Sequence, residues 1–428
     1  MIPNTHLANS RYTYKNHKYI FFLSVLLISC SSSDPDDNTN NDTDNPVSNC
    51  NPKISTNSPS SNWFVSFNGS GEESHGHFIL SCSDGGYLQI GETGFIPNTA
   101  KILAVKISAD GNLLWQTEIG QKGHNLGNAA LETDQNYIIV GSVNEDAAFI
   151  ILDKNSGAII ESKSINHGGS DAYEAIAQTP TGFIAVGYNN AEDRGNTFFT
   201  EGQGLIAFLD ANGTLINSQS INNFMAHAYR IKAYNSEYII SGLTEGAEDY
   251  ALININGDGT LNWHAKYGGT SSDHNFGMDI DASGSIFLTG HTLSNTENWD
   301  TYTMKIDTNG TLIWESKQGN PRGFDPRYIH DETWDIKATK DGGCIIVAGS
   351  GDEYESYDVY CSQTESSSNQ WLVYLIKYNE SGQIEWQQIY QSKDGNDWAG
   401  EAITLNADGG ALVAVDNGNF GFLKINSL

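Results

Sequence analysis

The chain has 428 residues and a formal net charge of −30 at pH 7. Such an excess of carboxylates repels phosphate backbones and anionic lipid headgroups, which argues against nucleic acid as a partner. Forty-four glycines against nine prolines fit a turn-rich β fold.

The first 29 residues have the layout of a signal peptide. Basic Lys15 and Lys18 precede an apolar run, residues 19–28, which is too short to span a bilayer as a stable anchor. The run ends in Leu27-Ile28-Ser29-Cys30, which resembles the box of bacterial lipoproteins. That resemblance implies that Cys30 receives a diacylglycerol and becomes the new N-terminus. An ordinary signal peptide with a chance cysteine is the alternative.

Residues 30–61 predict a disordered tether, because Ser, Asn, Asp and Pro dominate the segment. Near its start, Asp34-Pro35-Asp36-Asp37 resembles the signals that send lipoproteins of the Bacteroidetes to the outer face of the outer membrane. The resemblance implies a lipid-anchored protein of the outer membrane that faces the cell exterior.

Residues 62–428 repeat one phrase with a period of about fifty residues. Its clearest copy has the turn Asp307-Thr308-Asn309-Gly310 followed by Leu312-Ile313-Trp314. Short strands and glycine turns at this period predict the blade of a β-propeller, with four strands A to D. In the third copy the strands are expected at Glu174–Thr179, Phe183–Val186, Leu205–Leu209 and Thr214–Ile221. The periodic tryptophans are expected to stack between blades.

Strand order predicts seven blades and a closed ring. A strand D occurs first, at Asn62–Phe67, and a strand C occurs last, at Phe420–Asn426. The N-terminal strand can therefore complete the last blade and remove an open sheet edge. We expect an all-β, seven-bladed β-propeller. Its turns, such as Asp341-Gly342-Gly343, resemble the Asp-Gly-Gly propeller repeats common in surface proteins of Bacteroidetes.

Four cysteines follow Cys30. A bridge between Cys50 and Cys82 is plausible, since both are expected on the same face, whereas pairing Cys344 with Cys361 requires the loop around Cys361 to fold back. The chain contains no Cys-x-x-Cys spacing, phosphate loop or nucleophile elbow, so we expect neither a metal nor a cofactor.

The candidate site lies where the D–A and B–C loops emerge, on what we call the top face. Seven histidines fall in the predicted D–A loops, far more than chance placement gives. Together with nearby aromatic and basic residues they form the predicted ligand-binding set: His75, His77, His124, His167, Tyr173, His227, Tyr229, Arg230, His274, Arg327, His330, Trp334 and Trp398. The alternative is that these histidines hydrogen-bond a neighbouring blade and act as latches between blades.

Three functions are compatible with these residues. The favoured one is binding of an extracellular ligand, polysaccharide above all, because aromatic faces suit sugar rings. The second is a polysaccharide lyase of the seven-bladed type, in which a His or Tyr removes a proton and an Arg neutralises the uronate. Its catalytic candidates are Tyr173, His124, His167, Arg194 and Arg230. The third is a structural scaffold that binds a surface protein.

Overall fold

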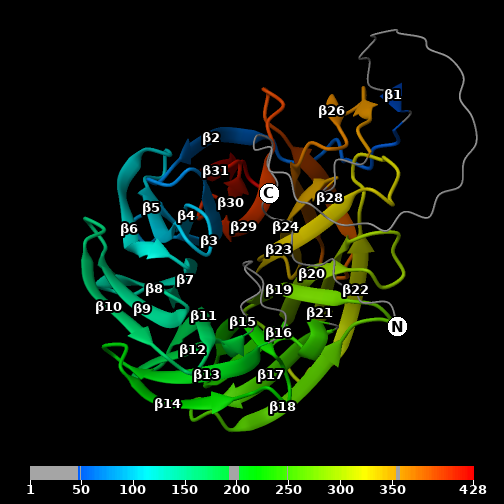
Figure 1. The fold of residues 1–428 in the computed structure, drawn as a ribbon. Helices are drawn as coiled ribbons and strands as arrows, with labels where there is room; N and C mark the ends of the chain where they lie inside the picture. The colour runs from blue at the N-terminus through cyan, green and yellow to red at the C-terminus, as the bar shows by residue number, and fades with distance from the viewer. Residues whose placement is uncertain (1–46, 49, 192–201, 248, 353–356) are drawn as a thin grey trace, which may run out of the picture.

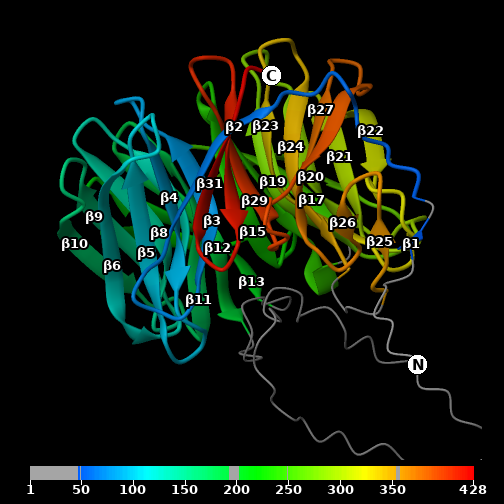
Figure 2. The same cartoon turned by 90° about the horizontal axis from the view of Figure 1, so that it is seen from above.

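The structure is a computed structural model that describes residues 47–48, 50–191, 202–247, 249–352 and 357–428. Seven four-stranded sheets are arranged in a ring around a central channel, as Figure 1 shows, and Figure 2 shows the same ring from the side. The prediction of an all-β, seven-bladed propeller is confirmed. Within the described ranges, no helix is long and apolar enough to cross a membrane.

Blades 1 to 4 each consist of four consecutive antiparallel strands. Blade 1 contains β3 (Ser74–Ser81), β4 (Tyr87–Thr93), β5 (Ala100–Ile107) and β6 (Leu113–Gly123). Blade 2 contains β7 (Asn125–Glu132), β8 (Asn136–Val143), β9 (Asp146–Asp153) and β10 (Ile159–Ile165). Blade 3 contains β11 (Ser170–Gln178), β12 (Gly182–Ala191), β13 (Gln203–Asp210) and β14 (Leu215–Ser220). Blade 4 contains β15 (His227–Tyr234), β16 (Glu237–Leu243), β17 (Tyr250–Asn256) and β18 (Leu261–Tyr267), with the short 3-10 helix η1 (Glu245–Ala247) after β16.

Blades 5 to 7 vary this plan. Blade 5 contains β19 (Asp273–Ile280), β20 (Ile286–Thr292), β21 (Asp300–Ile306) and β22 (Leu312–Gln318). Blade 6 contains β23 (His330–Ala338), β24 (Cys344–Gly351), β27 (Leu372–Tyr378) and β28 (Ile384–Tyr390). The insertion between β24 and β27 contains β25 (Tyr360–Cys361) and β26 (Ser366–Ser367). These two strands form a small sheet with the N-terminal β1 (Val47–Ser48). Blade 7 contains β29 (Ala399–Leu405), β30 (Ala411–Asp416), β31 (Phe420–Ile425) and the N-terminal β2 (Ser61–Phe67).

In blade 7, β2 is the outer strand and pairs antiparallel with β31, so that Phe67 lies opposite Phe420. The contribution of this pairing to ring closure stays a prediction.

The core lies between adjacent blades rather than inside one of them. Each of the seven largest hydrophobic clusters combines facing surfaces of two adjacent sheets, as in the cluster that joins Ile90 of blade 1 to Ile139 of blade 2. The periodic tryptophans belong to this packing. Trp115 lies against the turn glycine Gly157 of the next blade and donates a hydrogen bond from Nε1 to Lys154 O at 3.1 Å. Tryptophan and turn glycine therefore recur together because each blade docks on the turn of the next.

Part of the segment predicted as tether is packed on blade 6. Ser55 exchanges hydrogen bonds with Gln387 on the edge strand β28, and Tyr390 donates from its hydroxyl to Pro59 O at 2.7 Å. Lys53 donates to Gly319 O at 3.0 Å. The predicted disordered stretch to residue 61 is thus too long, because Lys53 N donates a hydrogen bond to Pro321 O and Ser55 N donates one to Gln387 O of the edge strand β28.

The expected disulfide pairing was also wrong. Cys50 is joined to Cys361 in the blade 6 insertion, while Cys82 and Cys344 are buried free thiols. The reason is the path of the segment after Cys50, which runs along blade 6 and places this cysteine beside the insertion, in a cluster with Phe324 and Val359.

Candidate functional site

Each innermost strand carries a one-residue β-bulge at the same place. In β3, for example, Gly76 lies opposite Gly91 and Phe78 opposite Ile90, so the ladder skips His77. The same shift occurs once in this position of every blade. The skipped residues, here called the bulge ring, are His77, Asn128, Glu174, Tyr229, Phe276, Trp334 and Glu401.

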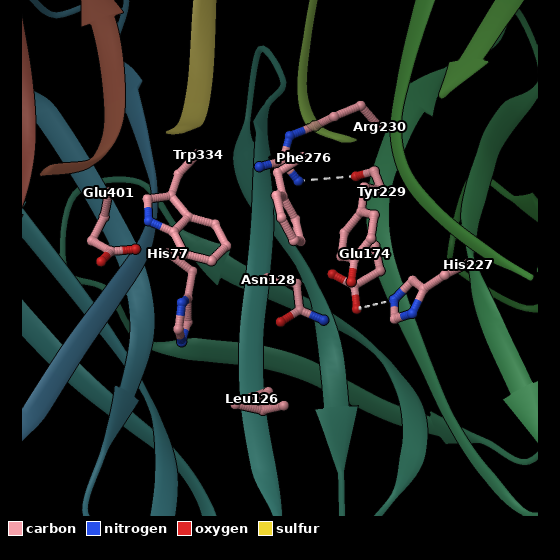
Figure 3. A pocket seen from close by; sticks show the side chains of 10 residues that line it. All are labelled: His77, Leu126, Asn128, Glu174, His227, Tyr229, Arg230, Phe276, Trp334 and Glu401. Atoms are coloured by element: carbon pink, nitrogen blue, oxygen red, sulfur yellow. Dashed lines mark hydrogen bonds and ion pairs between the residues drawn. The ribbon is translucent and has the colours of Figure 1, made fainter. Parts of the chain in front are cut away.

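All seven residues of the bulge ring line a single pocket in the central channel, together with Leu126, His227 and Arg230 (Figure 3). The pocket contains about 620 Å³ of space, part of it open to solvent. A bulge re-aims one side chain and is frequent next to functional sites. Sevenfold repetition of the bulge therefore directs one side chain from every blade to the same point.

In blades 1 to 5 a glycine on the second strand faces the residue before the bulge, whereas Ala348 and Val415 hold this position in blades 6 and 7. The bulge pushes a carbonyl of the first strand toward its neighbour, and a Cβ on Gly141 would lie 1.9 Å from Leu126 O. At Gly290 the corresponding distance to His274 O would be 1.7 Å. No side chain fits at such distances, so these positions require glycine. In the sequence, the bulge is therefore indicated by an apolar run in the second strand that ends in glycine.

The bulge ring is divided into an aromatic arc and a polar arc. Blades 4, 5 and 6 contribute Tyr229, Phe276 and Trp334, with ring centroids 4.9 and 4.6 Å apart along the series. The three rings form one cluster with Leu243. The Tyr229 and Phe276 rings pack edge to face and the Trp334 ring is tilted against Phe276, so the three form a continuous apolar wall on one side of the pocket.

Hydrogen-bonding groups occupy the other four blades. Glu401, His77, Asn128 and Glu174 come from blades 7, 1, 2 and 3, which are consecutive around the ring. Several of these groups are held in place by partners. His77 Nε2 lies 2.5 Å from Glu92 Oε2, and Asn128 donates from Nδ2 to Tyr173 O at 3.2 Å. The polar arc thus offers carboxylate, amide and imidazole groups in fixed positions.

His227 links the two arcs. Its ring stacks on Tyr229 with centroids 4.1 Å apart, and its Nε2 lies 3.1 Å from Glu174 Oε1. Arg230 follows on the same strand and donates from Nη1 to Tyr229 O at 2.9 Å. The dashed lines in Figure 3 mark both of these polar contacts. One carboxylate, one imidazole and one guanidinium are therefore available at the end of the aromatic arc.

Five of the seven histidines predicted in loops lie on strands instead. The innermost strands begin earlier than expected, because the bulge allows them to continue past the skipped residue. His75, His77, His227, His274 and His330 are consequently strand residues, and His124 immediately precedes β7. His167 remains in the loop before β11.

His75 and His227 contact neighbouring blades, whereas His124 and His274 contact residues of their own blades. His75 is buried in blade 1 and its Nδ1 lies 2.9 Å from Asp416 Oδ2 of blade 7. Burial alone would lower the pKa of His75, but the Asp416 carboxylate raises that pKa well above the usual value. In blade 2, His124 Nδ1 lies 3.6 Å from Glu145 Oε1. His274 packs against the ring of Trp299.

Five predicted ligand-binding residues meet in the pocket, namely His77, His227, Tyr229, Arg230 and Trp334. The other eight do not belong to the lining of this pocket, among them Tyr173, Trp398 and Arg327. Tyr173 is fully buried with its hydroxyl 2.7 Å from His167 Nε2, and Trp398 stacks on Phe64. Arg327 is an exposed partner of Asp325. Arg194 and Cys30 fall outside the described residues.

Sequence reasoning missed Asn128, Glu174, Phe276 and Glu401. These residues have no common side-chain chemistry, so a search by residue type does not group them. In blades 2, 3 and 5 the glycine after the apolar run of the second strand lies opposite the residue before the bulge, and counting back across the hairpin from it leads to Asn128, Glu174 and Phe276. In blade 7 this position is Val415, so Glu401 has no such signal.

Comparison with known proteins identifies the fold alone. No protein-family profile matches the sequence, and no curated protein is significantly similar to it. A catalytically inactive virginiamycin B lyase from Staphylococcus aureus, solved with quinupristin, aligns at 13% identity and a TM-score of 0.54, over 85% of this chain and 99% of the lyase chain. Sqt1 from Chaetomium thermophilum aligns at 8% identity and a TM-score of 0.50, over 86% and 98%. The Dos1 propeller aligns at 8% identity and a TM-score of 0.44, over 87% and 95%.

Proposed function

We propose that this protein is an outer-membrane lipoprotein that binds an extracellular polysaccharide in the pocket of the bulge ring. The observation that supports this function is the division of the ring into an aromatic arc and a polar arc. A sugar unit has C–H faces that pack on aromatic rings and hydroxyl groups that pair with carboxylates and amides. Both surfaces are present on opposite sides of one pocket.

The lyase alternative gives proton removal to a His or Tyr, with Tyr173, His124 and His167 as candidates. Of these, Tyr173 is fully buried in the interface between blades 2 and 3. A buried phenol that already contacts His167 has no path to a substrate in the channel. The scaffold alternative would be favoured if the protein binds no polysaccharide.

A binding panel with matched variants tests the proposal. Purified residues 47–428 are titrated calorimetrically with soluble starch, laminarin, mannan, xylan, pectin and alginate. We expect at least one of these polysaccharides to bind. The variants Trp334→Phe and Glu401→Gln should weaken its binding about tenfold or more, which corresponds to about 1.4 kcal/mol or more.

Two variants outside the pocket serve as controls. Trp398→Phe changes a tryptophan that stacks on Phe64, and Glu161→Gln changes an exposed carboxylate. Both should leave binding unchanged. If no polysaccharide binds, or if the control variants weaken binding as much as the pocket variants do, the proposed function is wrong and the scaffold alternative is favoured.

A further inference from the structure

A second cavity lies on the top face beside blade 4. It contains about 1240 Å³ of space, part of it open to solvent. Its walls are the D–A loop between β14 and β15, the B–C loop between β16 and β17, and the edge strand β18. We call this cavity the blade 4 groove, and its lining includes Asn223, Phe224, Thr244, Asp249, His264 and Lys266.

Phe224 gives the groove an aromatic wall. Its side chain is half-buried and packs on the core cluster between blades 3 and 4, and its ring centroid lies 4.9 Å from that of His264. The loops before β11 and β19 contain the adjacent glycines Gly168-Gly169 and Gly268-Gly269, whereas residues 221–226 before β15 contain no glycine. The repeat therefore does not require an aromatic residue in this loop, and Phe224 departs from it.

Polar groups in fixed positions line the rest of the groove. Lys266 donates a hydrogen bond from Nζ to Asp249 Oδ2 at 2.6 Å. Asp249 N donates to Thr244 Oγ1 and Thr244 N donates to Asp249 O, both at 3.1 Å, which holds the ends of this loop together. Asn222 and Asn223 are exposed. Sugar hydroxyl groups pair with groups of these kinds while a C–H face packs on an aromatic ring, so the groove has the same chemistry as the bulge ring.

The groove and the pocket of the bulge ring are neighbours. Phe224 lines the groove and His227 lines the pocket, and because they are three positions apart their Cα atoms are at most about 11 Å from each other. Leu243 belongs to the cluster of the aromatic arc, and the next residue, Thr244, lines the groove. Ala226 is buried and donates from N to Leu243 O at 2.8 Å, which ties these two segments together. The two cavities therefore adjoin the same short pieces of chain.

We infer that the blade 4 groove is a second binding site for the same glycan. A chain with sugar units in the pocket of the bulge ring continues into the groove and packs there on Phe224. Two adjacent cavities with the same combination of aromatic and polar groups favour one extended ligand over two unrelated ones. This inference rests on the proposed function and adds the class of ligand, a chain long enough to reach from one cavity to the other.

Chain length and a groove variant together test this inference. The polysaccharide that binds in the panel is partially hydrolysed and separated by size, and each fraction is titrated into the native protein and into Phe224→Leu, which loses the aromatic ring and keeps apolar bulk. The native protein should bind long fractions more tightly than the shortest fraction that binds. Phe224→Leu should weaken binding of the long fractions about fivefold or more. Its affinity for the shortest fraction should stay within about twofold of the native value, because that fraction occupies only the pocket.

Three further variants complete the comparison. His264→Ala changes an exposed residue of the groove, so it should reproduce the length-dependent loss without disturbing the core. Phe208→Leu changes a phenylalanine that packs on the same core cluster as Phe224 but is not among the described residues that line the groove, so it should leave every affinity unchanged. Trp334→Phe in the pocket should weaken short and long fractions alike.

The two failures are distinguishable. If Phe224→Leu and His264→Ala leave binding of the long fractions unchanged, or weaken all fractions by the same factor, the groove is not a glycan site and the inference is wrong, while the proposed function stands. If no fraction and no intact polysaccharide binds the native protein, the proposed function itself fails.

Discussion

At the scale of single residues, Asp331 makes the stability of the folded protein depend on pH. This residue of β23 is fully buried, and its Oδ2 accepts a hydrogen bond from Asn320 N at 2.6 Å. Burial, together with the nearby Asp300 carboxylate, raises the pKa of Asp331 to about 7. An aspartate in an unfolded chain has a pKa near 3.9. The folded protein therefore binds this proton more tightly, and its contribution to stability is lost as pH rises from about 4 to about 7.

The variant Asp331→Asn tests this link. Asparagine keeps an oxygen for Asn320 N and removes the charge, so the variant should be more stable than the native protein at pH 8, by on the order of 1–3 kcal/mol. The advantage should shrink toward pH 4. Denaturant unfolding at several pH values measures it, with Asp110→Asn at an exposed turn as the control. Equal stability of variant and native protein at pH 8 would contradict the argument.

At the scale of elements, β2 has the most distant pairing partner of any blade strand in the described chain. It pairs with β31 near the other end of the sequence, and Trp63, Val65 and Phe67 pack against the cluster around Phe422. Removing the strand would expose the edge of β31 and this apolar surface together. Unpaired edges of this kind promote association between molecules.

Deletion of residues 61–67 should therefore cause aggregation or a large loss of thermal stability. Light scattering and thermal melting measure the two effects. Deletion of seven residues in the predicted tether, 34–40, is the control and should change neither. A monomeric 61–67 deletion that melts like the native protein would show that this strand is not needed to close the ring.

At the scale of the whole molecule, the predicted lipid on Cys30 decides where the propeller resides. The variant Cys30→Ser should lose the lipid and leave the membrane fraction, because the chain offers no second anchor that we can identify in residues 31–61. Fractionation of cells followed by detection of the protein measures this, with Ser33→Ala as the control. Full retention of Cys30→Ser in the membrane fraction would refute the lipoprotein prediction.

The sequence by itself determined the architecture, because every blade repeats the same short pattern of strand and turn residues. Glycines at positive φ in the turns, such as Gly310 and Gly342, recur wherever a tight hairpin is needed. The periodic tryptophans recur because each blade docks on the next turn. Such signals depend only on residues that are close in sequence, so they can be recognised from the sequence alone.

The tertiary structure decided which residues meet. Cys50 pairs with Cys361 across 311 residues of sequence because the segment after Cys50 follows the edge of blade 6. Tyr173 and Glu174 are adjacent in the chain, yet one is buried between blades and the other lines the pocket, because side chains of a strand alternate and a bulge selects which one faces the channel. A one-residue shift of register changes the face of every side chain that follows, and the sequence fixes that register only through the contacts of the folded ring.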